Sequence, residues 1–417
     1  MPSGHRVLDE GAGAQGNVVA GVLARAEDVA SIVLADLDPE RARETAANIG
    51  SPRITVDRVD AEALDPTTAF LRSGRFDLIV NTALPEFIPN VMLAALRARV
   101  SYLDLSSLIF YERQGKPIEQ LEHESEWRTS GRTALVNAGS APGLTNVMAR
   151  EGADGFDRVE SIRIRDYSVT TSDRFEALWS LPVFLQDCAT EPMIWEDGRP
   201  KRMPIFSGEE TYDFPPPIGR PGKVYLHAHE EPVTIPLYVG KPVRHCDYKI
   251  GEPDIDAWRF LIQGLGLLDD APVEVRGVRV SPREVLLKRL PRTIAPQRLM
   301  ELAGSGRLNS QSMVVCEVDG WKDGRRGRIV LWSDSPDLRT ASTIVRGTSD
   351  VSLVTSVPAA TFSLMILRGQ IRRTGVVLPE MLGPEERSVF YRGIGGFGIQ
   401  VRRRIETDPS PDTRTGS

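Results

Sequence analysis

A glycine-rich turn close to the start of the chain constrains the fold more than any other segment. Residues 11–16 read Gly-Ala-Gly-Ala-Gln-Gly, the G-x-G-x-x-G pattern by which a strand passes into a helix. The first glycine allows the tight bend, the second lets the backbone approach a pyrophosphate, and the third lets the helix pack on the strand. Backbone N–H groups at the helix N-terminus then bind the phosphates. The pattern therefore predicts a dinucleotide-binding βαβ unit.

The segments around the turn support this prediction. Apolar residues at 7–8 begin a strand, and apolar residues recur at helical spacing over residues 18–23. A second apolar run, residues 31–35, ends in Asp36. This acid lies about 20 residues after the last glycine, where a residue that binds the ribose hydroxyls belongs. A helical hairpin with a glycine turn is the alternative, and this context disfavours it.

Charged residues in this unit bear on the cofactor. Asp9 and Glu10 lie directly before the first glycine, where a buried parallel strand is normally apolar. Buried carboxylates are costly unless they are paired, and these two bring negative charge close to an anionic pyrophosphate. Asp36, followed by Leu37, favours NAD because a carboxylate repels a 2′-phosphate, whereas Arg41 leaves NADP open.

Strands and helices continue to alternate over about the first 140 residues. Apolar runs at residues 76–81, 101–106 and 134–137 predict buried strands, and residues 89–99 predict a helix. This alternation predicts an α/β fold with a doubly wound parallel sheet, whose ligands bind beyond the carboxyl ends of the strands. The predicted cofactor contacts are Gly11, Gly13, Ala14, Gln15, Gly16, Asp36, Asn81, Thr82, Ala83, Ser106 and Gly139.

The pattern changes in the second half of the chain. Alternating apolar and charged residues over 158–170 predict half-exposed antiparallel strands. Residues 313–318 and 328–332 predict a hairpin whose loop covers 319–327. Residues 351–367 form one apolar helix, and the polar residues after 405 predict a disordered tail.

Composition excludes several classes of protein. The chain has 417 residues and a formal net charge of −6, so it carries no electrostatic footprint for nucleic acid. We find no apolar run long enough to cross a bilayer and no signal-peptide core, and expect no membrane partner. Cys188, Cys246 and Cys316 lie far apart, which predicts neither disulfides nor a structural zinc site. We therefore expect a cytoplasmic enzyme.

Three stretches together resemble the saccharopine dehydrogenase-like oxidoreductases. The first is the glycine turn, and the second is residues 138–146 (AGSAPGLTN), similar to the family's G-x-x-P-G-L-S-N segment. The third is a C-terminal pattern in residues 355–360 (TSVPAA), 368–371 (RGQI) and 375–380 (GVVLPE). Between them, residues 212–236 most resemble the lysine 6-dehydrogenase and carboxynorspermidine dehydrogenase branches.

The resemblance implies a Rossmann domain that is split in sequence around an inserted α+β catalytic domain with a mainly antiparallel sheet. It implies an NAD(P)-dependent dehydrogenase or reductase that interconverts an amine and an imine on an amino acid or polyamine-like substrate. Members often form dimers, so we expect a homodimer. The predicted parts are a dinucleotide-binding domain over residues 1–140, a substrate domain over 141–350, a helix over 351–405 returning to the Rossmann domain, and the tail over 406–417.

Chemistry at a C–N bond needs a group that handles the proton on nitrogen. His229 is the candidate, because in an alternating strand it shares a face with His227 and Glu231 while Glu230 points the other way. A purely structural histidine–carboxylate pair is the alternative, with equal weight. We expect no metal, because ligands two residues apart need other partners.

A second polar cluster covers residues 244–249. Arg244 suits a bidentate grip on a carboxylate, and Lys249 supplies charge or a proton. A solvated sheet edge is the alternative for such residues. The predicted catalytic residues are His229, Glu230 and Lys249, and the predicted substrate-binding residues are Arg244, Arg165 and His227.

Two other functions compete with the oxidoreductase. One is a transferase of the homospermidine synthase type, in which NAD oxidises the substrate and then reduces it again with no net turnover of the cofactor. The other is a non-catalytic NAD(P)-binding sensor, which the presence of Asp9 and Glu10 favours. Net formation of NADH separates the oxidoreductase from both.

Overall fold

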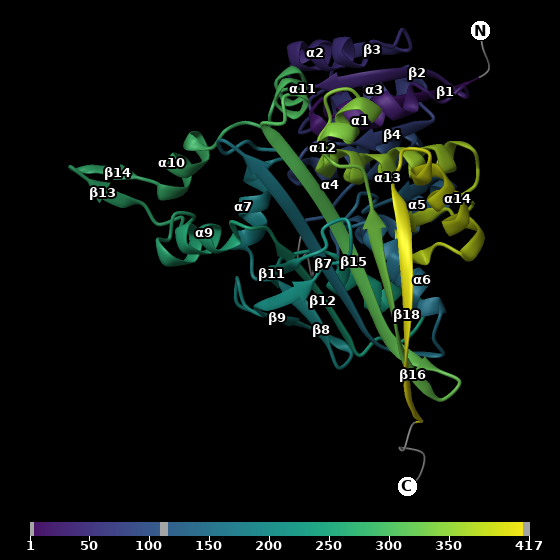
Figure 1. Ribbon diagram of the computed structural model, residues 1–417. Coiled ribbons are helices and arrows are strands. Elements are labelled where there is room, and N and C mark those ends of the chain that lie inside the picture. The colour runs from purple at the N-terminus through teal and green to yellow at the C-terminus, as the bar shows by residue number, and fades with distance from the viewer. Residues whose placement is uncertain (1–3, 109–115, 412–417) are drawn as a thin grey trace.

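Two β-sheets organise the chain, with helices packed around and between them (Figure 1). The computed structural model describes residues 4–108 and 116–411. Within these residues it has a seven-stranded sheet, a nine-stranded sheet and a two-stranded hairpin. Every strand pair in the first sheet is parallel, whereas the second sheet is mixed and mainly antiparallel.

The first sheet is a doubly wound Rossmann sheet with the order β17-β6-β5-β4-β1-β2-β3. Its strands are β1 (His5–Glu10), β2 (Val29–Asp36), β3 (Ile54–Arg58), β4 (Leu78–Asn81), β5 (Ser101–Asp104), β6 (Thr133–Leu135) and β17 (Gly375–Val377). Its helices are α1 (Ala14–Leu23), α2 (Pro39–Ile49), α3 (Leu64–Gly74), η1 (Pro85–Phe87), α4 (Ile88–Ala98), η3 (Glu119–His123) and α5 (Glu124–Ser130). The predicted fold class is confirmed, and the sheet is completed by a strand from the C-terminal part of the chain.

The second sheet runs in the order β10-β11-β12-β7-β15-β16-β18, with β8 and β9 attached at β12. Its strands are β7 (Arg158–Ser172), β8 (Met193–Glu196), β9 (Arg199–Arg202), β10 (Glu210–Asp213), β11 (Pro221–Leu226), β12 (His245–Gly251), β15 (Leu308–Lys322), β16 (Arg325–Asp334) and β18 (Gln400–Pro411). The hairpin of β13 (Val273–Val275) and β14 (Val278–Val280) projects from the body of the protein (Figure 1).

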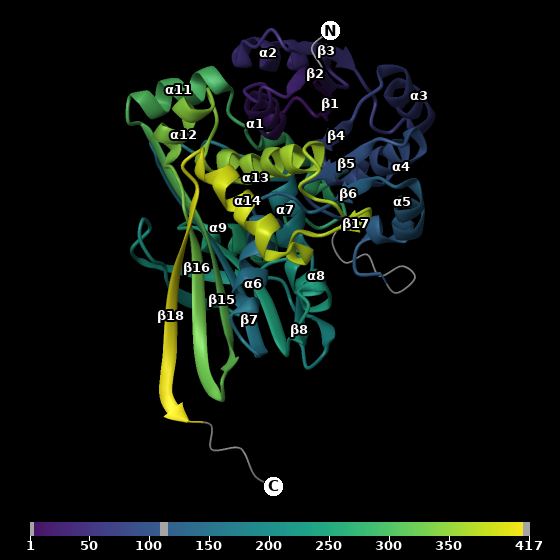
Figure 2. The ribbon, with the colours of Figure 1, turned by 90° about the vertical axis from the view of Figure 1, so that its right-hand side faces the viewer.

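The remaining helices surround this sheet and link it to the first. They are α6 (Leu144–Asp154), α7 (Leu181–Ala189), α8 (Glu231–Tyr238), α9 (Ile255–Arg259), η4 (Phe260–Gly264), α10 (Pro282–Arg289), α11 (Pro296–Gly304), α12 (Leu338–Ile344), α13 (Asp350–Leu367), η5 (Pro379–Met381) and α14 (Pro384–Gly395). Figure 2 shows α13 at the junction of the two domains. It packs on α1 of the Rossmann domain and also contacts β15.

Helix α13 is the most apolar long helix in the described part of the chain. The side chain of Ser349 caps its N-terminus by accepting a hydrogen bond from the Ser352 backbone N–H. By length and composition alone it could cross a membrane, contrary to our prediction that no such run exists. However, 72% of it is buried inside the protein, as expected for a core helix. One continuous apolar core runs from the Rossmann sheet through this helix to the second sheet.

Two predictions about the C-terminal part of the chain are wrong, one about the loop over residues 319–327 and one about the tail. The predicted loop 319–327 is mostly strand, because β15 and β16 continue to a tight turn at Asp323-Gly324. Both turn residues have positive φ, 51° and 72°, as the mirror-image turns favoured in hairpins require. The predicted disordered tail is also shorter, since β18 continues to Pro411 and pairs with β16. Residues 412–417 of that tail lie outside the described residues.

Candidate active site

A cavity of about 1280 Å³ lies where the carboxyl ends of the parallel strands meet the second sheet. One lobe is lined by the glycine turn, Asp36 and the loop after β4. The other lobe is lined by residues of β7, α7, β12 and the segment between β11 and α8. The dinucleotide turn and the candidate proton-handling residues therefore face the same space.

The glycine turn has the form that a dinucleotide requires. A β-carbon at Gly16 would lie 1.9 Å from the carbonyl oxygen of Gly11, so only glycine allows this helix to pack so close. A β-carbon at Gly13 would meet no heavy atom within 4 Å, which leaves room for a phosphate to approach the backbone. The Asp36 carboxylate accepts hydrogen bonds from the backbone N–H groups of Ala12 and Asp38, both at 3.0 Å. The residues present therefore fit a bound dinucleotide.

Asp9 and Glu10 are both buried at the end of β1. Asp9 accepts a hydrogen bond from the Thr82 hydroxyl at 3.0 Å, and burial raises the pKa of Asp9 well above its ordinary value. Neither carboxylate oxygen of Glu10 has a hydrogen-bond partner among the described residues. Burial and the charges of Asp36 and Asp60 raise the pKa of Glu10 to about 8. Glu10 lines the cavity, whereas Asp9 does not.

Most of the predicted cofactor contacts line the cavity. Two do not. Gly16 lies beneath the turn, in the first turn of α1. Gly139 also lies behind the surface, where its carbonyl accepts a hydrogen bond from the Leu144 N–H, and residues 140–142 line the cavity in its place. The predicted contacts that do line it are Gly11, Gly13, Ala14, Gln15, Asp36, Asn81, Thr82, Ala83 and Ser106.

His229 lies in the second lobe, between β11 and α8. The chain leaves β11 after Leu226, so the predicted alternating strand through this segment is wrong. Because the backbone turns here, both neighbouring glutamates reach the same imidazole. His229 Nδ1 donates a hydrogen bond to Glu231 Oε2 at 2.5 Å and lies 3.4 Å from Glu230 Oε2. The prediction that Glu230 points away is therefore also wrong.

These carboxylates determine the charge of the histidine. Burial lowers the pKa of His229, but Glu231, then Glu230 and Asp187, more than offset it and raise the pKa to about 9. His229 is therefore an imidazolium at neutral pH. His227 also lines the cavity, and burial beside His229 lowers its pKa to about 3, which keeps it neutral.

Tyr248 and two aspartates complete the lobe, and none of the three is among the predicted catalytic or substrate-binding residues. The Tyr248 ring stacks on the His229 ring with centroids 3.9 Å apart, and its hydroxyl donates to Asp166 at 2.9 Å. Burial raises the pKa of Asp166 to about 6 and that of Asp187, on α7, to about 8. The signal for Asp166 was strand parity, because it shares the face of the apolar residues Ile162 and Ile164.

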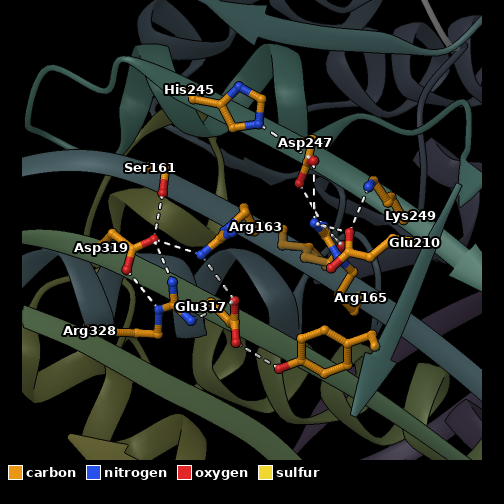
Figure 3. Close-up of polar contacts among 12 residues, drawn as sticks. Ser161, Arg163, Arg165, Glu210, His245, Asp247, Lys249, Glu317, Asp319 and Arg328 are labelled. Atoms are coloured by element: carbon orange, nitrogen blue, oxygen red, sulfur yellow. Dashed lines mark hydrogen bonds and ion pairs between the residues drawn. The ribbon is translucent and has the colours of Figure 1, made fainter. Parts of the chain in front are cut away.

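Arg165 and Lys249 lie on the opposite face of the same strands and do not line the cavity. Figure 3 shows Arg165 bound to Asp247 at 2.6 Å and to Glu210 at 2.8 Å, with Lys249 bound to Glu210 at 2.6 Å. Arg244 is exposed and bonds Asp197. The substrate and catalytic roles predicted for these three residues are therefore corrected, because their charges are taken up by partners outside the cavity.

The donor atoms of His229, Glu230 and Glu231 lie within 4.8 Å of one another, a spacing that a metal ion can use. Each residue already has a protein partner. Glu230 accepts from the Ser107 N–H at 2.7 Å, and Glu231 accepts from the Thr145 hydroxyl at 2.7 Å. These bonds orient the group as a hydrogen-bonded acid–base cluster.

A dinucleotide turn facing a buried imidazolium across one cavity defines a nicotinamide-dependent oxidoreductase. Comparison with protein families agrees with this class. Residues 8–135 match the saccharopine dehydrogenase NADP binding domain, and residues 139–392 match the saccharopine dehydrogenase C-terminal domain. The chain belongs to the saccharopine dehydrogenase family, and the predicted resemblance and NAD(P)-binding domain are confirmed.

Two curated relatives match nearly the whole chain. Carboxyaminopropylagmatine dehydrogenase of Synechocystis sp. is 26% identical over 402 residues, which cover 94% of this chain and 96% of the relative. Carboxynorspermidine synthase of Vibrio cholerae is 25% identical over 400 residues, which cover 91% of this chain and 92% of the relative. Both names describe enzymes of carboxylated polyamine-like molecules.

Solved structures show the same fold. Saccharopine dehydrogenase (L-Glu forming) of Saccharomyces cerevisiae has a TM-score of 0.70 at 16% identity, covering 96% of this chain and 100% of that one. Homospermidine synthase of Legionella pneumophila, in complex with NAD, has a TM-score of 0.66 at 13% identity, covering 99% and 94%. The likeness to homospermidine synthase is therefore one of fold alone. The family models and the named relatives fit the dehydrogenase prediction better than the transferase alternative.

Proposed function

We propose that this enzyme interconverts an amine and an imine at the carbon next to nitrogen of a polyamine-like amino acid, with His229 handling the proton. The observation that carries the proposal is the position of His229, held by Glu231, in the same cavity as the dinucleotide turn. When bound, NAD(P)(H) supplies or accepts the hydride. The names of the two relatives support a substrate of this kind.

The charge of His229 favours one direction of the reaction. An imidazolium at neutral pH is a proton donor, which suits protonation of a substrate nitrogen during imine reduction. Glu231 holds Nδ1, and Nε2 makes no hydrogen bond within the described residues, so we assign the transferred proton to Nε2. Amine oxidation needs the neutral imidazole, so its rate should rise as the pH approaches about 9.

The charges around the second lobe support a cationic substrate. Asp166, Asp187 and Glu230 line it. Apart from His229, which is paired with Glu231, the cations among the described residues that line the cavity lie elsewhere or are paired. Arg41 is beside Asp36 in the dinucleotide lobe, and the other two, Arg174 and Arg283, form ion pairs with Glu176 at 2.7 Å and Asp270 at 3.0 Å. We infer that the ammonium groups of a polyamine-like chain bind these carboxylates.

Turnover of a panel of carboxylated and uncarboxylated polyamines, followed through NAD(P)H absorbance, tests the proposal. We expect net cofactor turnover with the wild type and a loss of roughly 10²- to 10⁴-fold in His229→Gln, the range that general acid–base catalysis supplies. His245→Gln is the matched control, because His245 lies on the opposite face and bonds Asp247. Wild-type protein that binds NAD(P)(H) but turns over no member of the panel would contradict the proposal.

The family resemblance also supports a homodimer and a cytoplasmic location, which we propose on that ground alone. Light scattering of the purified full chain tests the first, and cell fractionation tests the second.

A further inference from the structure

We propose that Glu10 is an additional cofactor-specificity residue, a neutral acid under the dinucleotide lobe that makes NAD(H) binding increasingly preferred over NADP(H) as the pH rises. Three observations carry the inference. Glu10 is 2% exposed, it lines the cavity, and neither of its carboxylate oxygens has a partner among the described residues. A buried carboxyl group at the wall of a ligand site that has no hydrogen-bond partner among the described residues is costly, and calls for an explanation in the site beside it.

Glu10 lies near the residues that we expect to bind the nucleoside end of the cofactor. It ends β1 directly before the glycine turn and pairs in register with Ala35 of β2 and Asn81 of β4. Asp36, the acid expected at the ribose hydroxyls, follows Ala35, and Asp60 lies after β3 in the same lobe. Glu10, Asp36 and Asp60 therefore put three carboxyl groups around the place where NADP(H) carries its extra phosphate.

Asp36 cannot swing away from that phosphate. Its two carboxylate oxygens are held by the backbone N–H groups of Ala12 and Asp38. This fixed negative charge disfavours a 2′-phosphate at every pH at which it is ionised. Arg41 is a cation beside this acid, 4.0 Å from Asp36 Oδ2.

Glu10, in contrast, makes a contribution to the binding of a 2′-phosphate that changes with pH. Among the described residues, the charged groups near Glu10 are Asp9 on its own strand, Asp36 on β2 and Asp60 after β3. Arg41 on α2 lies beside Asp36, and the partner of Glu10 on β4 is the neutral Asn81. Burial, Asp36 and Asp60 keep Glu10 neutral below about pH 8. Above that pH the free enzyme loses this proton, and a bound 2′-phosphate, with its added negative charge, forces Glu10 to take the proton back.

The affinity for NADP(H) should therefore fall as the pH rises. Taking up a proton to bind costs affinity once the pH exceeds the pKa of the free enzyme. A ligand that keeps Glu10 fully neutral loses about tenfold in affinity between pH 7 and pH 9 for a free-enzyme pKa of about 8. NADPH approaches this limit because its 2′-phosphate is ionised across the range. NADH carries a hydroxyl there and loses less than about threefold.

The test is direct binding of NADH and NADPH to the full chain, by fluorescence titration without substrate, at pH 7 and pH 9. We expect the ratio of the NADPH to the NADH dissociation constant to rise roughly fivefold with pH in the wild type. In Glu10→Gln, which is isosteric and cannot ionise, the ratio should stay constant. Glu62→Gln is the control, since Glu62 is an exposed carboxylate lining the same lobe.

A wild-type ratio that is the same at both pH values overturns the proposal, even if Glu10→Gln does not fold. A ratio that rises equally in wild type and Glu10→Gln also overturns it, because another group would then be titrating. Since no substrate is present, these outcomes are independent of whether the proposed amine chemistry is correct.

Discussion

The two faces of strands β7 and β12 carry polar clusters of opposite character. On the outer face, Arg165, Lys249, Asp247 and Glu210 pair with one another, and a separate ion-pair cluster on the same face joins β7 to β15 and β16 (Figure 3). On the cavity face, Asp166 is beside Tyr248, and the only described cation of this cluster is His229.

The difference separates a structural cluster from a functional one. The outer charges are nearly balanced, so each ion offsets the cost of burying its neighbour. On the cavity face the described carboxylates outnumber the described cations. Burial raises the pKa values of Asp166 and Asp187, and no arginine or lysine among the described residues offsets this rise. Perturbed acids in a cavity mark the place where a ligand supplies the missing charge.

The largest expected effect is a loss of stability when a charged residue of the outer face is replaced. Arg165→Leu leaves Asp247 buried without its main partner, which costs about 3–5 kcal/mol of unfolding free energy. Arg165 holds the pKa of Asp247 below its ordinary value, so this contribution is lost in the wild type as the pH falls through that lowered pKa. Urea denaturation measures the effect.

Replacing both partners, in Arg165→Met with Asp247→Leu, should restore most of the stability because no charge is left unpaired. If Arg165→Leu instead abolished turnover while the urea midpoint stayed unchanged, the outer cluster would be part of the reaction and the comparison would fail.

The next largest expected effect is a loss of reaction rate when the carboxylate that holds His229 is replaced. Glu231→Gln removes the carboxylate that does most to raise the pKa of His229, so the imidazolium loses its proton at lower pH. Below about pH 9 the wild-type histidine is the acid needed for imine reduction, and the alkaline limb of the rate profile should move towards 6.5 in the variant. At pH 8 we expect a loss of rate of up to about 30-fold, the fall in the protonated fraction when the pKa moves from about 9 to near 6.5.

The His229–Glu231 pair also stabilises the folded protein, and this contribution changes with pH in a defined direction. Since the folded pKa of His229 is raised, the contribution is fully present below the unfolded value near 6.5 and is lost as the pH rises through about 9. An unshifted pH–rate profile in Glu231→Gln would show that another group handles the proton.

The smallest effect concerns substrate affinity. Asp187→Asn removes one carboxylate from the cavity face without a hydrogen-bond partner to lose among the described residues. We expect KM for a polyamine-like substrate to rise about tenfold with kcat nearly unchanged, because a charge-assisted hydrogen bond is lost. Asp197→Asn, at the exposed partner of Arg244, is the control. Equal KM values in the two variants would contradict an ammonium-binding role for this lobe.

Sequence reasoning located the histidine but assigned its surroundings wrongly. Arg165 was chosen over Asp166 although Asp166 shares its strand face with Ile162 and Ile164, which are buried in the core. The predicted site likewise includes Lys249 and not its neighbour Tyr248, because the prediction weighed charge and did not take strand parity into account. Glu230 and Glu231 were placed on opposite faces because a strand was expected where the chain turns into α8.

The sequence by itself determined the Rossmann fold, the glycine turn and the position of an acid, Asp36, at the end of β2. These follow from local spacing, since three glycines and a periodic apolar pattern specify a strand, a turn and a helix wherever they occur. Only the tertiary structure decided which face of β7 and β12 meets the cavity, and that Glu10 is buried there with no hydrogen-bond partner among the described residues. The physical reason is that alternation along a strand defines two faces, but only the packing of distant segments, such as α13 on α1, determines what each face meets.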